Sequence, residues 1–225
     1  MIKHVLRFSF LLVVIFAGCS QSHKKGISEG TIEFDAVAVD KNNSLADMAP
    51  KTLLVKIKDG KSYAEMSSAM GLLTVVYISD YEAKTLTQLV KVVYKKHICI
   101  QQADELDKAI AASPKPKVQF TSDTKVIAGY KCKKAIISYD DPKMPKFDVF
   151  YTDEIAIEKP NWFNEFREID GVLLEYQLKR YNIELRFTAK TITPGPISDD
   201  TFKVPDDDYR KVSQKELEDI FSNLQ

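Results

Sequence analysis

Few side chains in this sequence could do acid–base or nucleophilic chemistry. His4 and His23 lie near the N-terminus, so a Ser-His-Asp or Cys-His mechanism would have to use His97. The chain contains no Gly-x-Ser-x-Gly, His-Glu-x-x-His, Walker or Gly-rich dinucleotide signature, and it has only 8 glycines. We therefore expect no catalytic residue, no cofactor and no enzymatic activity. We interpret His97 as a surface or core residue of a strand.

Adjacent carboxylates occur at Asp140-Asp141, Asp199-Asp200 and 206–208, each close to a proline. Calcium needs about six to eight converging oxygens, and these runs lack the alternating spacing of a calcium loop. We interpret them as solvated turns and predict no metal site. A hydrolase with scattered residues, such as a carboxylate pair brought together from distant strands, is the least favoured alternative.

Cys19 is the residue whose chemistry is clearest. Lys3 and Arg7 precede an apolar run from Phe8 to Phe16, which is about half the length of a membrane-spanning helix. The run ends in Phe16-Ala17-Gly18-Cys19, which resembles the lipobox of bacterial lipoproteins, with Phe16 in place of the usual Leu. This resemblance implies that 1–18 is a signal peptide and that Cys19 carries a diacylglyceryl group and a further acyl chain such as palmitate. The alternative is an ordinary signal peptide that happens to contain a cysteine.

The segment 19–28 is polar and has no structural period, so it is predicted to tether the lipid to a folded domain. By analogy with lipoproteins, Ser20 after the lipidated residue indicates sorting to the outer membrane. Lys24-Lys25, where an acidic cluster would favour surface export, indicates an orientation toward the periplasm.

Composition argues for one folded domain and against a nucleic-acid partner. The sequence has 225 residues with 32 basic and 32 acidic side chains. Removal of 1–18, with Lys3 and Arg7, leaves 30 basic and 32 acidic side chains, a net charge of −2. A nucleic-acid groove needs clustered positive charge, so we expect no such partner. Residues 29–225 are predicted to form a single β-rich domain.

Cys99 and Cys132 remain once Cys19 is lipidated. An oxidising compartment permits a disulfide between them. The favoured alternative is that both are small buried hydrophobes, since no Cys-x-x-Cys spacing supports a redox or zinc site.

Alternating polar and apolar residues predict many strands. The clearest case is Thr31–Ala36, and Asp59-Gly60 is a strong hairpin signal. Short connections imply an antiparallel sheet, with tight turns at Asp170-Gly171 and Tyr181-Asn182. The other predicted strands are Leu53–Lys58, Lys61–Ser67, Leu72–Ile78, Thr85–Lys91, Val92–Ile100, Val118–Phe120, Lys125–Tyr139, Phe147–Tyr151, Phe163–Ile169, Val172–Arg180 and Ile183–Ile192.

Helices are expected at Leu45–Ala49 after Ser44, at Asp104–Ala112, and near the C-terminus. There, Ser213 and Glu216 form a capping box, and an apolar stripe follows at helical spacing, consisting of Leu217, Ile220, Phe221 and Leu224. The stripe is predicted to pack on the sheet; the alternative is a partner-binding helix. The pattern predicts an α+β fold in which a large curved antiparallel sheet has a few helices on its concave side.

Three segments together resemble a known family: Lys125–Ala135 (KVIAGYKCKKA), Asp170–Tyr176 (DGVLLEY) and Asp200–Pro205 (DTFKVP). They are similar to a family of bacterial lipoproteins of unknown function, which looks like the lipoprotein-carrier superfamily of LolA and LolB. The resemblance covers about Glu29 to Tyr209. It implies a half-open β-barrel closed by helices around an apolar hollow that holds acyl chains. No arginine of the mature chain can be assigned as the helix latch of the carriers.

The resemblance implies a lipid-anchored, non-enzymatic protein that binds an apolar ligand, either acyl chains or the lipid of another lipoprotein. The alternative is a structural or interaction subunit at the outer membrane with a filled core. Met48 and Met70 could join Met66 in supplying adaptable contacts. Trp162, Phe163 and Phe166 could form an aromatic rim or, preferably, a hydrophobic corner under a loop. The expected lining residues are Phe34, Tyr63, Met66, Val75, Tyr77, Phe150, Leu174, Tyr176 and Leu185.

Overall fold

A computed structural model describes residues 26–42, 46, 49–68, 71–180, 183–205 and 208–223. The predicted signal peptide, Cys19 and most of the predicted helix after Ser44 lie outside these ranges. So do Met48, Met70, Leu224 and the predicted turn at Tyr181-Asn182.

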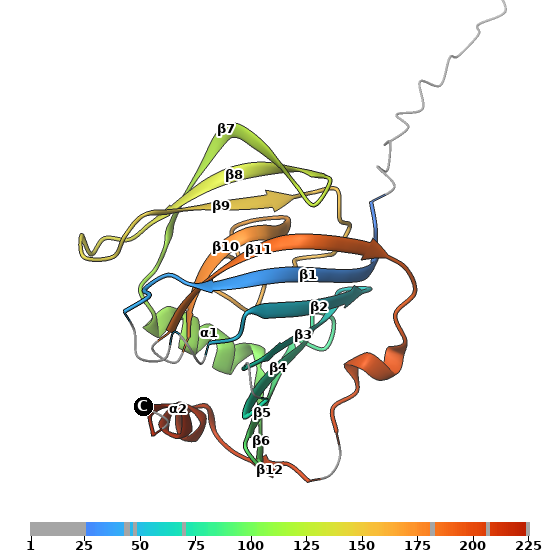
Figure 1. The fold of residues 1–225 in the computed structure, drawn as a ribbon, viewed down its shortest axis with the longest axis vertical. Coiled ribbons are helices and arrows are strands. Elements are labelled where there is room, and N and C mark those ends of the chain that lie inside the picture. The colour runs from blue at the N-terminus through green and yellow to red at the C-terminus, as the bar shows by residue number, and fades with distance from the viewer. Residues whose placement is uncertain are drawn as a thin grey trace, which may run out of the picture.

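Within the described residues, one strongly curved sheet of twelve strands dominates the fold (Figure 1). Its order is β12-β6-β5-β4-β3-β2-β1-β11-β10-β9-β8-β7, and β12 and β7 are the two edges of an open sheet. All pairings are antiparallel except that of β12 with β6. The strands are β1 (Glu29–Ala38), β2 (Thr52–Lys58), β3 (Lys61–Ser67), β4 (Leu73–Asp80), β5 (Thr85–Val92), β6 (Lys95–Gln102), β7 (Lys117–Ile127), β8 (Tyr130–Ser138), β9 (Phe147–Thr152), β10 (Val172–Arg180), β11 (Ile183–Pro194) and β12 (Arg210–Lys211).

The described helices are α1 (Ala103–Ala112), α2 (Gln214–Ser222) and the short 3-10 helix η2 (Asp199–Phe202). The curved sheet agrees with the prediction, but the fold is mostly β rather than α+β. No helix in the described ranges is long and apolar enough to cross a bilayer.

Local sequence accounts for most strand positions. In β1, Ile32, Phe34 and Ala36 are buried and alternate with polar residues, as the period-two pattern predicts. The β2–β3 hairpin turns at Asp59 (φ 47°) and Gly60 (φ 76°), two left-handed positions that Asp-Gly adopts readily. The alternation and the turn are therefore both confirmed.

Two predicted strands are wrong, and a third, Val92–Ile100, is wrong at its start, because Val92 ends β5 and Val93-Tyr94 form a turn before β6. The run Lys125–Tyr139 is split by a turn at Ala128 (φ 48°) and Gly129 (φ 86°), so its two parts pair as β7 and β8. The segment Phe163–Ile169 forms turns rather than a strand. Asn161 holds this segment, because its Nδ2 donates to the carbonyl oxygens of Ile169 (2.8 Å) and Gly171 (2.9 Å).

The predicted C-terminal helix is confirmed as α2. Ser213 Oγ accepts from Glu216 N (3.2 Å), and Glu216 Oε2 accepts from Ser213 N (2.9 Å), which completes the capping box. Leu217 and Phe221 are buried against β4, β5 and β6, in a cluster with Val75, Val90 and Cys99. The apolar stripe therefore packs on the chain's own sheet. The predicted helix Asp104–Ala112 is confirmed as α1.

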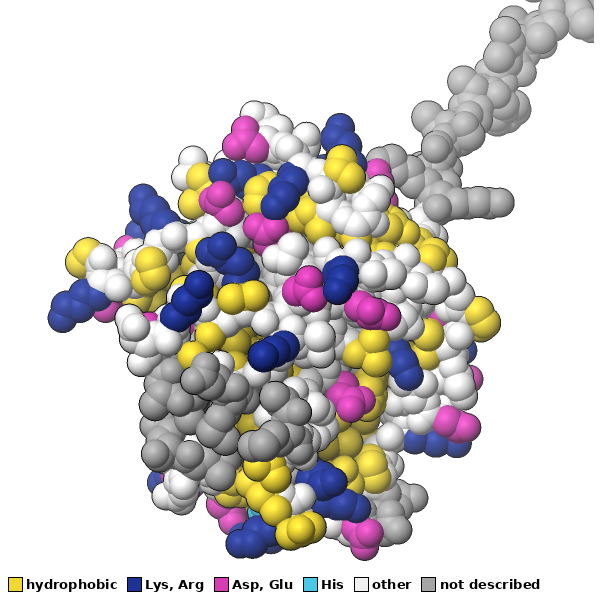
Figure 2. Space-filling model, in the orientation of Figure 1, with side chains coloured by type: hydrophobic (Ala, Val, Ile, Leu, Met, Phe, Trp, Pro, Cys, Tyr) yellow, Lys and Arg dark blue, Asp and Glu magenta, His cyan; other side chains and the backbone are white. Residues whose placement is uncertain are grey.

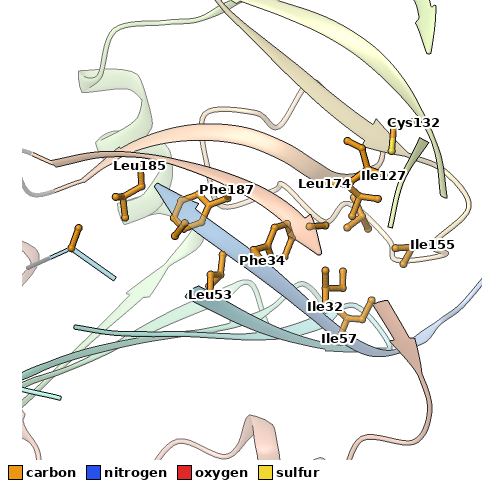
Figure 3. Packing of buried hydrophobic residues seen from close by; sticks show 14 residues of the cluster. Ile32, Phe34, Leu53, Ile57, Ile127, Cys132, Ile155, Leu174, Leu185 and Phe187 are labelled. Carbon is orange, nitrogen blue, oxygen red and sulfur yellow. The ribbon is translucent and has the colours of Figure 1, made fainter. Parts of the chain in front are cut away.

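The cross-strand register defines which side chains share a side of the sheet. We call the side that carries Phe34, Tyr176 and Phe187 the inner face, and the other the outer face. The largest buried cluster lies on the inner face of β1, β2, β10 and β11 and continues toward β7 and β8 (Figure 3). Met66 pairs with Val75, so the surface under α2 continues the inner face. On the outer face, Phe202, Val204 and Tyr209 pack against buried residues of β4, β5 and β6.

Candidate functional site

Aromatic rings meet on the inner face around Tyr176. The Phe187 ring stacks on it with centroids 5.1 Å apart, and the rings of Phe34 (6.0 Å) and Phe166 (6.4 Å) approach it edge-on. Each such ring pair contributes about 0.5–1.5 kcal/mol beyond its buried area. Burial raises the pKa of the Tyr176 hydroxyl, so this group carries its proton at neutral pH. We call these four rings the aromatic centre.

Strand register brings three members of the aromatic centre together. Phe187 in β11 lies between Ala36 of β1 and Tyr176 of β10, which are its direct partners in the neighbouring strands. Phe34 precedes Ala36 by two residues and therefore points to the same face. Phe166 comes from the turn segment between β9 and β10 and adds the fourth ring.

Six of the nine predicted lining residues lie in, or pack against, one inner-face cluster: Phe34, Met66, Phe150, Leu174, Tyr176 and Leu185. Val75 and Tyr77 belong to the neighbouring cluster under α2. Whether any of the nine contacts a ligand stays a prediction.

Tyr63 does not lie on the inner face, which corrects the expectation for this residue. It pairs with Lys56 and Ile78 and packs against the outer-face cluster. Its hydroxyl donates to Glu65 Oε2 at 2.6 Å, and burial together with this carboxylate raises its pKa. The physical reason is parity: Tyr63 and Met66 are three residues apart in β3, so their side chains point to opposite faces.

The inner face is filled by its own side chains. Phe34, Leu174 and Leu185 are all buried in one cluster of side chains, and Figure 3 shows Phe34 and Phe187 converging from neighbouring strands. Two hollows in the described part of the chain are lined mainly by polar groups. One, of about 300 Å³, lies beside Lys146, Phe147, Asp148, Glu175, Gln177 and Arg186, and the other, of about 390 Å³, beside Asp59, Gly60, Tyr81, Glu82, Lys84, Ala156 and Glu158. Neither is lined by the aromatic centre.

The sequence interpretation missed Phe187, and it placed Phe166 in an aromatic rim or a corner under a loop rather than beside Tyr176; these two rings complete the aromatic centre. Phe187 could have been found, because it follows Leu185 by two residues in the same predicted strand. Phe166 could not have been found from periodicity, because its segment is not a strand.

Cys99 and Cys132 are both buried and free, so the disulfide that an oxidising compartment would permit between them is not formed. Cys99 lies in the cluster under α2 and Cys132 in the main inner-face cluster. Burial raises the pKa of Cys132 to about 11, which keeps its thiol protonated and unreactive at neutral pH. The interpretation of both as buried hydrophobes is confirmed. In the described ranges, no group of three or more His, Cys, Asp or Glu side chains is arranged to hold a metal ion.

His97 is buried beneath the C-terminal segment, and its Nδ1 has no hydrogen-bond partner among the described residues. Burial lowers the pKa of His97 below its ordinary value of 6.5; Arg210 and Lys95 lower it further, and Glu216 opposes them. The neutral imidazole is thus the form that the fold accommodates.

This burial predicts a loss of stability in mild acid. Stability due to neutral His97 is fully present above the unfolded pKa near 6.5, and it is lost as the pH falls through the lower folded pKa. The slope from one such group reaches at most about 1.4 kcal/mol per pH unit. Urea unfolding between about pH 7 and pH 5 should therefore show a shallower fall for His97→Gln than for the unchanged chain. Parallel pH profiles would contradict this assignment.

Comparisons with known proteins show the fold but no family. No family model matches the chain, and a search of curated proteins finds no match. Among solved structures, PNGF-II is 14% identical with a TM-score of 0.55; the match covers 86% of this chain and 33% of PNGF-II. This chain thus spans about a third of that protein. MucB in complex with MucA (12% identical, TM-score 0.34) is matched over 79% of this chain and 54% of that one. LprF from Mycobacterium bovis (12% identical, TM-score 0.29) is matched over 78% and 89%, respectively.

Proposed function

We propose that this chain is a non-enzymatic, lipid-anchored interaction protein of the outer membrane, facing the periplasm, with a filled core. One observation favours an interaction protein with a filled core over a protein that binds an apolar ligand. The inner-face residues expected to line an apolar hollow, Phe34, Leu174 and Leu185, are instead buried within one cluster of packed side chains. A hollow for an acyl chain would need that surface to be open.

The free edge of β7 is the surface that best fits a protein partner. β7 is an 11-residue strand with a neighbour on one side only, so one row of its backbone groups is available for strand addition. Phe120 (52% exposed) and Val126 (69% exposed) lie along it. By contrast, α2 buries its apolar stripe on its own sheet, which leaves that helix little apolar surface for a partner.

The second candidate is binding of an acyl chain or of the lipid of another lipoprotein. It is favoured by Met66, Phe150 and Tyr176, which are only partly buried beside the main cluster. Their movement would open a path to the aromatic centre, and methionine adapts to irregular apolar ligands. The sequence resemblance to lipoprotein carriers supports this candidate as well.

A binding experiment separates the two candidates. All described strands and all four buried clusters lie within residues 26–223, so a chain that starts at Gly26 contains the folded part. With the filled core, we expect native mass spectrometry to show the protein mass without lipid and a fluorescent fatty acid to remain unbound. A saturable fatty-acid signal that Tyr176→Ala weakens, and that Phe120→Ala on the β7 edge leaves unchanged, would establish the second candidate instead.

A further inference from the structure

Three exposed apolar side chains gather at one end of the sheet. Tyr94 is 91% exposed, Val93 43% and Leu72 40%. Val93 and Tyr94 form the turn between β5 and β6, and Leu72 directly precedes β4. Val93 N donates to the Leu72 carbonyl oxygen at 2.6 Å, so the two turns are joined. We call Leu72, Val93 and Tyr94 the apolar tip.

The backbone conformation at Val93, in the apolar tip, is unfavourable for a valine. Val93 has φ 55°, in the left-handed region, where a β-branched side chain is strained by about 1–3 kcal/mol. Glycine or asparagine would satisfy a tight hairpin at this position without that strain. Since Val93 is not buried in the core either, neither the turn nor the packing requires a valine here.

The chain segments that form the apolar tip carry positive charge only. From Leu89 to Gln101 the sequence contains Lys91, Lys95 and Lys96 and no acidic residue, and from Met66 to Ser79 it contains no charged residue. Lys91 lies directly opposite Lys96 in the β5–β6 ladder, an arrangement that like-charge repulsion destabilises.

Asp208 lies close to one of these lysines. Lys96 Nζ is 3.5 Å from Asp208 Oδ2; the Lys96 side chain is 36% exposed and that of Asp208 is 74% exposed. Within the described ranges, no acidic side chain forms an ion pair with Lys91 or Lys95. In Figure 2, hydrophobic and basic side chains lie next to one another, with acidic side chains among them, at the lower end of the molecule, where β5, β6 and β12 lie in Figure 1.

We propose that the apolar tip and Lys91, Lys95 and Lys96 form a surface that docks on an anionic phospholipid bilayer. Apolar side chains flanked by lysines match the acyl boundary and the anionic headgroups of such a surface. The tip lies far from the point where residues 26–28 enter the sheet beside Ile155 (Figure 1). The docking surface is therefore distinct from the predicted lipid anchor, and it does not depend on the proposed function.

Vesicle sedimentation with a chain starting at Gly26 tests the proposal. The unchanged protein should bind vesicles of phosphatidylethanolamine and phosphatidylglycerol at low salt, and should bind phosphatidylcholine vesicles much more weakly. Val93→Gly/Tyr94→Ser should weaken binding at least about tenfold, since burial of two apolar side chains is lost. Lys91→Gln/Lys95→Gln should weaken it roughly 30-fold, at about fivefold for each lysine.

Matched variants elsewhere on the surface serve as controls. Val37→Ser removes an exposed valine on β1, and Lys143→Gln/Lys146→Gln removes two exposed lysines before β9; both should leave binding unchanged. Val93→Gly alone should keep or raise the thermal midpoint because it relieves the strained backbone, so weaker binding could not be ascribed to unfolding. Equal binding by tip and control variants, or no binding by the unchanged chain, would overturn the proposal.

Discussion

Replacing Phe187 by alanine should lower the free energy of unfolding by about 3–5 kcal/mol. The side chain is 2% exposed, stacks on Tyr176 and lies in the main inner-face cluster between β1 and β10. Its removal loses the buried apolar area and leaves a cavity that rigid neighbouring strands fill poorly. Because a domain of this kind is stable by only about 5–15 kcal/mol, the loss is a large share of the total.

Chemical denaturation followed by circular dichroism measures this change. Phe120→Ala is the matched control, because it removes the same side chain from a position that is 52% exposed, and it should cost under about 1 kcal/mol. Phe187→Leu should recover most of the lost stability, since it conserves more of the volume. Similar costs for Phe187→Ala and Phe120→Ala would show that the aromatic centre does not hold the inner face together.

The second large effect is expected from Cys19→Ala, which should release the protein from membranes almost completely. An acylated Cys19 with several chains contributes about 0.8 kcal/mol per buried methylene, whereas alanine contributes no acyl chain. Fractionation of the producing bacterium, with a high-salt wash of the membranes, measures the effect. The wash removes attraction between the lysines beside the apolar tip and anionic lipids. The protein that remains in the membrane fraction is therefore held by the covalent anchor.

A matched change beside Cys19 sharpens this experiment. Ser20→Ala keeps the cysteine and should leave the protein in the washed membrane fraction. Equal membrane retention of Cys19→Ala and the unchanged chain would show that lipidation of this residue is not what holds the protein. The same fractions, separated into inner and outer membranes, test the predicted outer-membrane location.

The elements that the sequence predicted correctly are those decided by neighbouring residues. The alternation of β1, the Asp59-Gly60 turn and the Ser213–Glu216 capping box each depend on interactions within a few residues. The errors arose where local patterns compete. Lys125–Tyr139 is β-rich throughout, yet the turn at Ala128-Gly129 divides it, and the apolar residues of Phe163–Ile169 pack as turns held by Asn161.

The sequence by itself determined a β-rich chain, the helix at Asp104–Ala112, the capped helix after Ser213, and an N-terminal pattern that predicts a lipid anchor at Cys19. Only the tertiary structure decided that the inner face is filled, that Tyr63 lies on the outer face, and that Leu72 meets Val93 at one exposed tip. The physical reason is the distance along the sequence over which the deciding interactions act. Strand and helix preferences are set within a few residues, whereas filling a curved sheet depends on how side chains from distant strands such as β1, β10 and β11 fit together.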